Sequence, residues 1–167
     1  MKESERDLRH ELAVNLDGGN AHMTFDEVVG NFPLELINTK APQVPYGPWH
    51  FIEHMRIAQW DILQFIINPG HVSPDYPYGY RPGVHKTADE KSWKHSINSF
   101  KKDLRTLSEM ALDDSVDLFS PIPHAPRYTI FKELLTVSAH NSYHIGEFAM
   151  LRQVLNAWPE DRPYLTG

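Results

Sequence analysis

The stretch TIFKELLTVSAHNSYHIGEFAMLRQVLNA, residues 129–157, decides the fold of this chain. Its apolar residues recur every three or four positions, which is the spacing of one face of an α-helix, and Pro159 ends the pattern. His140 and His144 occupy two positions of this stripe. We therefore predict a long helix whose core-facing side carries two imidazoles. The other stripe positions are Ile130, Leu134, Val137, Phe148, Leu151 and Leu155.

Two earlier segments, residues 48–68 and residues 87–112, show the same helical spacing. Pro48 suits the first turn of a helix, where its missing N–H leaves no bond unmade. Thr87 and Glu90 have the spacing of a capping box, in which each side chain bonds the other residue's backbone. Both segments therefore predict core-facing helices. Their apolar stripes are Phe51, Met55, Ala58, Ile62 and Phe65 in the first, and Trp93, Ile97, Phe100, Leu104 and Leu107 in the second.

The N-terminal segment predicts a shorter helix, because Leu8, Leu12 and Leu16 recur at four-residue spacing up to a pair of glycines. A second short helical piece begins at Thr24, which forms a capping box with Glu27. The N-terminal helix supplies the first helix of the bundle, and the three long segments supply the others.

The connections between these helices are long and rich in proline and glycine, a composition that cannot extend a helix. No segment shows sustained two-residue alternation, so the sequence predicts an all-α helical bundle with crossover loops. The length of 167 residues is that of one ordinary domain, and we expect residues 1–167 to form it. The connections are residues 33–47, 69–83 and 113–126.

Composition excludes several classes of partner. The net charge of −6 has the wrong sign for binding the phosphate backbone of nucleic acid, and no apolar run is long enough to span a membrane. The charged residues 1–7 lack the apolar stretch of a signal peptide, which predicts a cytoplasmic protein. The chain contains no Cys, so any metal must be bound by His and carboxylate side chains.

Ten His are present, and two pairs lie four residues apart: His50 with His54, and His140 with His144. On a helix, residues at this spacing project from one face about 6 Å apart, which suits two ligands of one metal ion. A third imidazole, from His54 or His50, would complete a three-nitrogen site with an open position for Zn²⁺, Ni²⁺ or Fe²⁺. The alternative is that these residues are core histidines with ordinary hydrogen-bond partners.

Three segments together resemble the DinB-like superfamily, the DinB/YfiT metalloenzymes. They are WHFIEHMRIAQWD (residues 49–61), SPDYPYGY (residues 73–80) and AHNSYHIGE (residues 139–147). The resemblance spans nearly the whole chain and implies a four-helix bundle that binds one divalent metal ion, which we expect to be Zn²⁺ or Ni²⁺. By the same resemblance the ligands are His54, His140 and His144, and His50 either lines the pocket or packs beside it.

The better-understood members of this superfamily are thiol-dependent transferases and isomerases, together with a few hydrolases. The resemblance therefore implies a metal-dependent transferase or hydrolase that activates water or an external low-molecular-weight thiol for attack on a small electrophile. It also implies a homodimer. The alternative is a non-catalytic, metal-binding or stress-response bundle that binds a small ligand or partner. No classical catalytic motif occurs, so the sequence assigns no catalytic residue.

Two further residues are candidates for the pocket or for contact with a metal ligand. Glu147 follows His140 by seven residues and so lies on nearly the same helical face. It either approaches the metal or a metal ligand, or it is an ordinary surface carboxylate. His22 precedes the short helical piece and either faces the pocket mouth or caps that helix.

Overall fold

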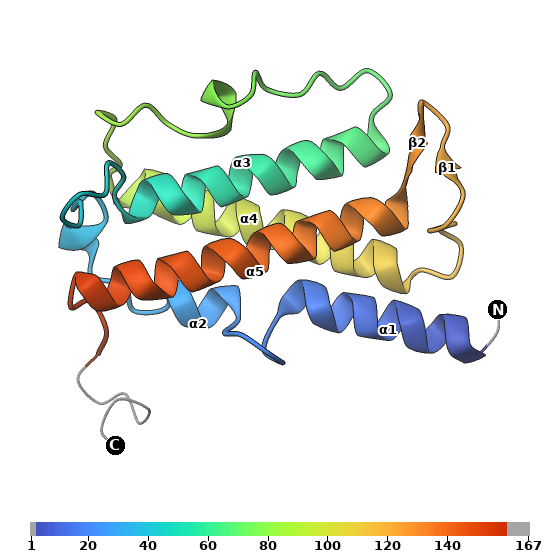
Figure 1. Ribbon diagram of the computed structural model, residues 1–167, viewed down its shortest axis with the longest axis horizontal. Coiled ribbons are helices and arrows are strands. Elements are labelled where there is room, and N and C mark those ends of the chain that lie inside the picture. The colour runs from blue at the N-terminus through green and yellow to red at the C-terminus, as the bar shows by residue number, and fades with distance from the viewer. Residues whose placement is uncertain (1–2, 160–167) are drawn as a thin grey trace.

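The computed structural model describes residues 3–159, which form five α-helices, two short 3-10 helices and one two-stranded sheet (Figure 1). The predicted all-α class is confirmed, whereas the DinB-like bundle topology stays a prediction. The elements in chain order are α1 (Glu3–Asp17), α2 (Phe25–Val29), η1 (Leu34–Leu36), α3 (Pro48–Ile67), η2 (Tyr78–Tyr80), α4 (Glu90–Leu112), β1 (Pro121–Ile122), β2 (Ala125–Thr129) and α5 (Ile130–Val154).

Four long helices lie side by side. Helix α4 packs against α1 and α3, and α5 packs against α3 and α1. The connection between α3 and α4 runs back along α3, so these two helices point in the same direction while α1 and α5 point in the other (Figure 1). This crossover places residues 68–89 beside α3, where the 3-10 helix η2 contacts it.

The predicted signals at the first helix boundaries are confirmed. Gly18 and Gly19 have φ angles of +79° and +93° and end α1, a conformation that glycine adopts without steric cost. The Thr24 side chain accepts a hydrogen bond from the Glu27 N–H, and the Glu27 carboxylate accepts one from the Thr24 N–H. Pro48 occupies the first turn of α3, as expected.

The bounds of two predicted helices are wrong. Helix α4 begins at Glu90, because the side chain of Asp89, rather than that of Thr87, accepts the capping bond. Helix α5 begins at Ile130 and ends at Val154, short of the predicted residues 129–157. Asn156 takes a left-handed conformation with φ of 50°, which turns the chain out of the helix before Ala157.

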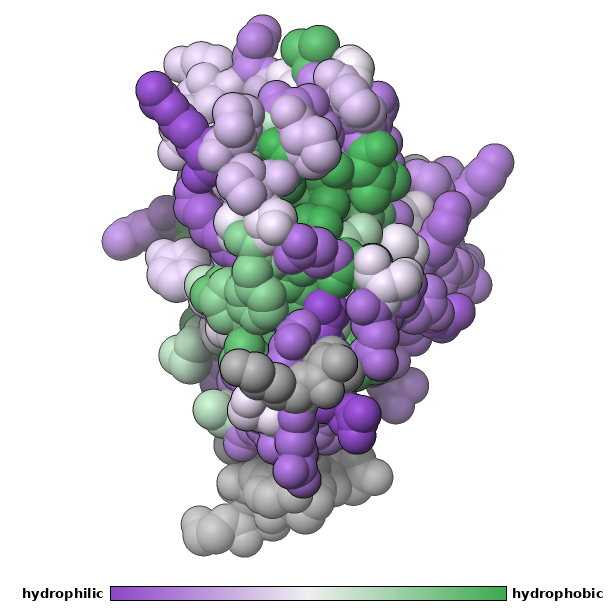
Figure 2. Space-filling model, turned by 90° about the vertical axis from the view of Figure 1, so that its right-hand side faces the viewer, coloured by the Kyte–Doolittle hydropathy of each residue, from purple (hydrophilic) through white to green (hydrophobic). Residues whose placement is uncertain are grey.

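The third connection contains a strand pair that the sequence did not predict. Strands β1 and β2 are antiparallel, with Pro121 opposite Thr129 and Ile122 opposite Ala125. The pair is short and irregular and contains proline, so it lacks the alternation that would have indicated strands. Figure 2 shows this end of the molecule, where apolar surface gathers among polar side chains. Phe119 is among the exposed apolar residues of this region.

The buried face of α3 is turned relative to the predicted stripe. Ile52, Leu63 and Ile66 are buried, whereas Phe51, Ile62 and Phe65 are only half-buried. The predicted positions Met55 and Ala58 are buried as expected.

The stripe of α5 also differs from the prediction. Between Val137 and Phe148 it continues through Asn141 and Ile145, not through the two histidines. His140 and His144 lie beside the stripe and are half-buried.

A buried polar pair explains this shift. The Gln59 amide donates a hydrogen bond of 2.7 Å to the Phe100 carbonyl, and the Asn141 amide donates one of 2.9 Å to Gln59. Gln59 lies between Met55 and Leu63 on α3, which belong to different apolar clusters of the core. The core is therefore divided by a polar layer at the level of the histidines.

Candidate metal centre

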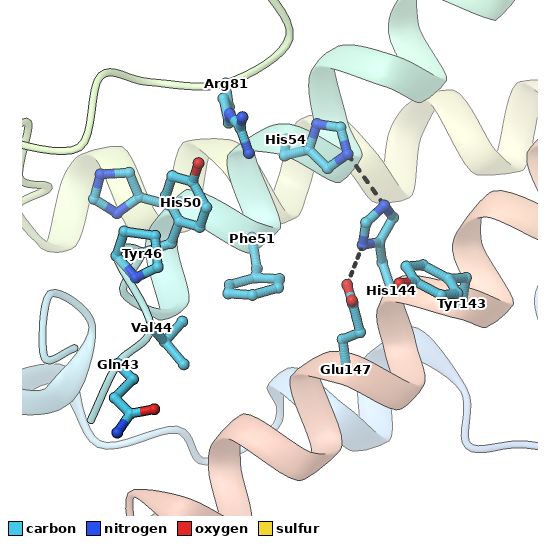
Figure 3. A pocket seen from close by; sticks show the side chains of 11 residues that line it. Gln43, Val44, Tyr46, His50, Phe51, His54, Arg81, Tyr143, His144 and Glu147 are labelled. Atoms are coloured by element: carbon cyan, nitrogen blue, oxygen red, sulfur yellow. Dashed lines mark hydrogen bonds and ion pairs between the residues drawn. The ribbon is translucent and has the colours of Figure 1, made fainter. Parts of the chain in front are cut away.

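Three histidines converge where α3 faces α5. The Nε2 atom of His54 lies 3.1 Å from Nε2 of His144 and 3.3 Å from Nε2 of His140. One ligand atom from each residue fits within a group whose members are all within 4.8 Å of one another. His140 and His144 come from successive turns of α5, and His54 reaches across from α3 (Figure 3). The structure therefore brings together the three residues named as ligands from the sequence, and they could hold a metal ion.

Hydrogen bonds fix which nitrogen of two rings is free. His54 Nδ1 lies 2.8 Å from the Tyr80 carbonyl oxygen, which only accepts, so this nitrogen carries the proton. His144 Nδ1 lies 2.7 Å from Glu147 Oε2 and donates to that carboxylate in the same way. In the neutral rings, both Nε2 atoms then present lone pairs. Two lone pairs at 3.1 Å repel each other unless a cation lies between them.

The surroundings of two of the three rings, His54 and His140, favour the neutral form. Burial lowers the pKa of His54 below its usual value. Burial, followed by the neighbouring His144 and His54, lowers the pKa of His140 to about 4. Neutral imidazole is the form that binds metal ions, so these two rings are in the metal-binding form at neutral pH.

The spacing of the nitrogens fits a metal ion. Two nitrogens bound to one tetrahedral Zn²⁺ at about 2.05 Å lie about 3.3 Å apart. The separations of 3.1 and 3.3 Å between His54 and its two partners are close to this value. Three imidazoles also leave at least one position open, which is the ligand set of catalytic rather than structural zinc. Hydrogen bonds donated by the Nδ1–H group to a carbonyl or a carboxylate are the usual supports of metal-binding histidines.

Two cavities reach the histidines, and Arg81, on the loop after α3, lines both of them. The first, of about 410 Å³, contacts His54 and His144 (Figure 3). The second, of about 440 Å³, contacts His54 and His140. The open side of the three-histidine group is therefore accessible to a small molecule. The first cavity is also lined by Val44, Tyr46, Phe51, Arg81, Tyr143 and Glu147.

A buried carboxylate fixes the loop beside the site. Asp61 is 7% exposed, and its Oδ2 accepts a hydrogen bond of 2.6 Å from the Tyr80 hydroxyl. Its Oδ1 lies 2.6 Å from His71 Nε2, which donates to it. Burial, with Asp61 adding to it, raises the pKa of Tyr80 to about 12, so the hydroxyl keeps its proton. The sequence did not single out His71 or the Tyr80 carbonyl. Both lie in an irregular loop, and the conformation of that loop, which no local pattern predicts, brings them to α3.

His50 lines the first cavity but is not part of the three-histidine group. Its Nδ1 accepts a hydrogen bond of 3.3 Å from the Gly47 N–H. Its Nε2 therefore carries the proton and donates to the Gly83 carbonyl at 3.2 Å. With both nitrogens engaged, His50 ties the start of α3 to the crossover loop.

His22 and Glu147 take different places. His22 Nδ1 lies 2.7 Å from the Met23 carbonyl, and its Nε2 lies 2.8 Å from the Ser142 hydroxyl, so this ring joins the connection after α1 to α5. Glu147 lines the first cavity and accepts a hydrogen bond from the Nδ1–H group of His144. Of these two candidates, Glu147 is the one that contacts a member of the histidine group.

These features define a helical protein with a three-histidine group able to hold a metal ion. Comparison with models of protein families, with curated proteins and with solved structures gave no match. Among residues 3–159, no helix combines the length and apolar character needed to cross a bilayer.

Proposed function

We propose that this protein is a metal-dependent enzyme that binds Zn²⁺ or Ni²⁺ through His54, His140 and His144. The observation that carries the proposal is the pair of fixed rings, His54 and His144, whose unprotonated Nε2 atoms lie 3.1 Å apart beside a third imidazole. Purely structural histidines usually direct their lone pairs at hydrogen-bond donors. A bound divalent metal lowers the pKa of a coordinated water or thiol, which gives a nucleophile at neutral pH.

The chain's own residues would position and enclose the reaction. Tyr80 and Glu147 hold the rings of His54 and His144 in the ligand orientation. The apolar side chains Val44 and Phe51 line the approach to the histidines. The chain has no Cys, so a thiol transfer would require an external low-molecular-weight thiol.

The contacts among α1, α3, α4 and α5 support the proposal that the fold is a DinB-like four-helix bundle. The reaction class suggested by that resemblance is transfer to, or hydrolysis of, a small electrophile. The homodimer stays a prediction, which analytical ultracentrifugation of the purified protein tests.

Elemental analysis of protein purified without a His tag or chelator tests the metal site. We expect about one equivalent of Zn²⁺ or Ni²⁺ in the wild type and much less in His144→Ala, because two remaining nitrogens form a weaker site. His10→Ala, at an exposed position of α1, is the matched control and should keep the metal. No metal in the wild type, even after reconstitution with either ion, contradicts the proposal.

Activity separates the enzyme from the non-catalytic alternative. The metal-loaded protein is screened for thiol transfer and hydrolysis on small electrophiles, with His144→Ala as the reference. Turnover that requires His144 supports the enzyme. A full metal complement with no turnover in any screen favours the metal-binding bundle.

A further inference from the structure

Arg81 lies at the rim of both cavities, and its charge is available to a ligand. Within residues 3–159, none of the ion pairs includes this side chain. Its guanidinium lies over the ring of Tyr46, with Cζ 4.5 Å from the ring centroid. Figure 3 shows Arg81 directed from the loop toward the space between Tyr46 and His54. The cation therefore faces the region in front of the histidines.

The backbone on both sides of Arg81 is held by side chains of α3. Tyr80 is bound through its hydroxyl to Asp61 and through its carbonyl to His54. Two residues after Arg81, the Gly83 carbonyl accepts a hydrogen bond from His50. A group held in this way loses little freedom when it binds a ligand, which favours affinity. The backbone of Arg81 is thus held at the cavity rim, and its exposed side chain contacts the ring of Tyr46.

The remaining lining defines what such a cation would recognise. Among the described residues that line the two cavities, Arg81 is the only Lys or Arg. The Glu147 carboxylate accepts a hydrogen bond from the His144 N–H at Oε2. Val44, Pro45 and Phe51 add apolar wall to the first cavity. One planar cation beside an apolar wall matches a molecule with a single carboxylate and an apolar body.

We propose that Arg81 binds the carboxylate of the substrate, and that the substrate is a small carboxylic acid whose apolar body lies along Val44 and Phe51. Only the placing of a reacting group at the histidines rests on the proposed function. A single guanidinium fork pairs with the two oxygens of a carboxylate, whereas a phosphate dianion calls for more donors than this rim provides.

Binding of phenylacetate and of its neutral counterpart, phenylacetamide, tests this inference by isothermal titration calorimetry. The full-length protein is used both loaded with Zn²⁺ and after chelator treatment, and its metal content is measured in each sample. The variants are Arg81→Met, Arg81→Lys and the control Arg127→Met, at an exposed position of β2 outside both cavities.

We expect the wild type and Arg127→Met to bind the acid at least about tenfold more tightly than the amide. Arg81→Met should lose this preference and bind the amide unchanged, while Arg81→Lys keeps part of it. Three results would overturn the inference. The wild type binds acid and amide equally, Arg81→Met binds the acid as tightly as the wild type does, or the wild type does not bind the acid.

The two proposals fail separately in this experiment. Arg81-dependent binding of phenylacetate to protein that takes up no metal supports the inference and contradicts the metal site. If the protein binds stoichiometric zinc but binds phenylacetate equally well with and without Arg81, the metal site is supported and the inference is contradicted. The carboxylate then binds elsewhere in the cavity.

Discussion

The carbonyl oxygen of Tyr80 lies 2.8 Å from Nδ1 of His54, so an irregular loop determines which nitrogen of a helical histidine is free. The same tyrosine anchors itself to α3 through its hydroxyl, at Asp61. The loop therefore meets α3 at two points on the side of the metal centre. Any change that frees Tyr80 should act on the ring of His54.

Tyr80→Phe should weaken metal binding while the helices stay folded. The variant keeps the ring but loses the hydrogen bond to Asp61, which allows the carbonyl to move away from His54. Supporting groups of metal ligands typically contribute about 10-fold to 100-fold in affinity, and we expect the lower part of that range. Competition with a chromophoric chelator measures the affinity, and proteolysis within residues 69–83 should become faster.

The control for this change lies two residues away. Tyr78 is 86% exposed in the same 3-10 helix, and Tyr78→Phe should leave both metal affinity and proteolysis unchanged. If both variants lose metal affinity equally, the hydrogen bond from the Tyr80 hydroxyl to Asp61 is not the cause of the loss, and this prediction is wrong.

Glu147→Ala should also lower metal affinity, by about 10-fold to 100-fold, because His144 loses the acceptor that fixes its ring. Glu147→Gln should cost less, since its amide oxygen can still accept the Nδ1 proton. The metal dissociation constants of the two variants are measured beside Glu109→Ala, an exposed position of α4. Unchanged affinity in Glu147→Ala would show that this carboxylate does not support the metal ligand.

Much of the helical framework could be predicted from local sequence signals. Glycine with positive φ ends α1, Pro48 opens α3, and Thr24 with Glu27 caps α2. These signals act within a few residues of the chain, so no knowledge of the fold is needed to read them. The same holds for His140 and His144, whose spacing places them together on any helix.

The third ligand and its supports depend on how distant segments pack. Spacing alone left His50 and His54 as equal candidates, and only the packing of α3 against α5 brings His54 to the pair. The sequence predicts that the stripe of α5 runs through the two histidines, whereas in the structure it runs through Ile145 and the polar residue Asn141. It is buried because Gln59 supplies a partner from another helix.

Gln59→Leu tests the importance of that polar layer for stability. The substitution leaves the Asn141 amide buried without its acceptor, at a cost of about 1 to 3 kcal/mol in the free energy of unfolding. Urea denaturation of the metal-free protein measures the loss. The double variant Gln59→Leu with Asn141→Leu removes both polar groups and should recover part of it. A double variant that is less stable than the sum of the single changes would contradict this account.

The stability of the metal-free protein should fall with acid because of His140. Its pKa is about 4 in the folded state, against the usual value of 6.5, so the unfolded chain binds more protons between these two pH values. The contribution of this residue is therefore complete above pH 6.5 and is lost as the pH falls toward 4. The loss is at most about 1.4 kcal/mol for each pH unit. Urea denaturation at pH 7 and pH 5 should show a smaller decrease for His140→Gln than for the wild type. Equal decreases in the two proteins would mean that another group causes the acid sensitivity.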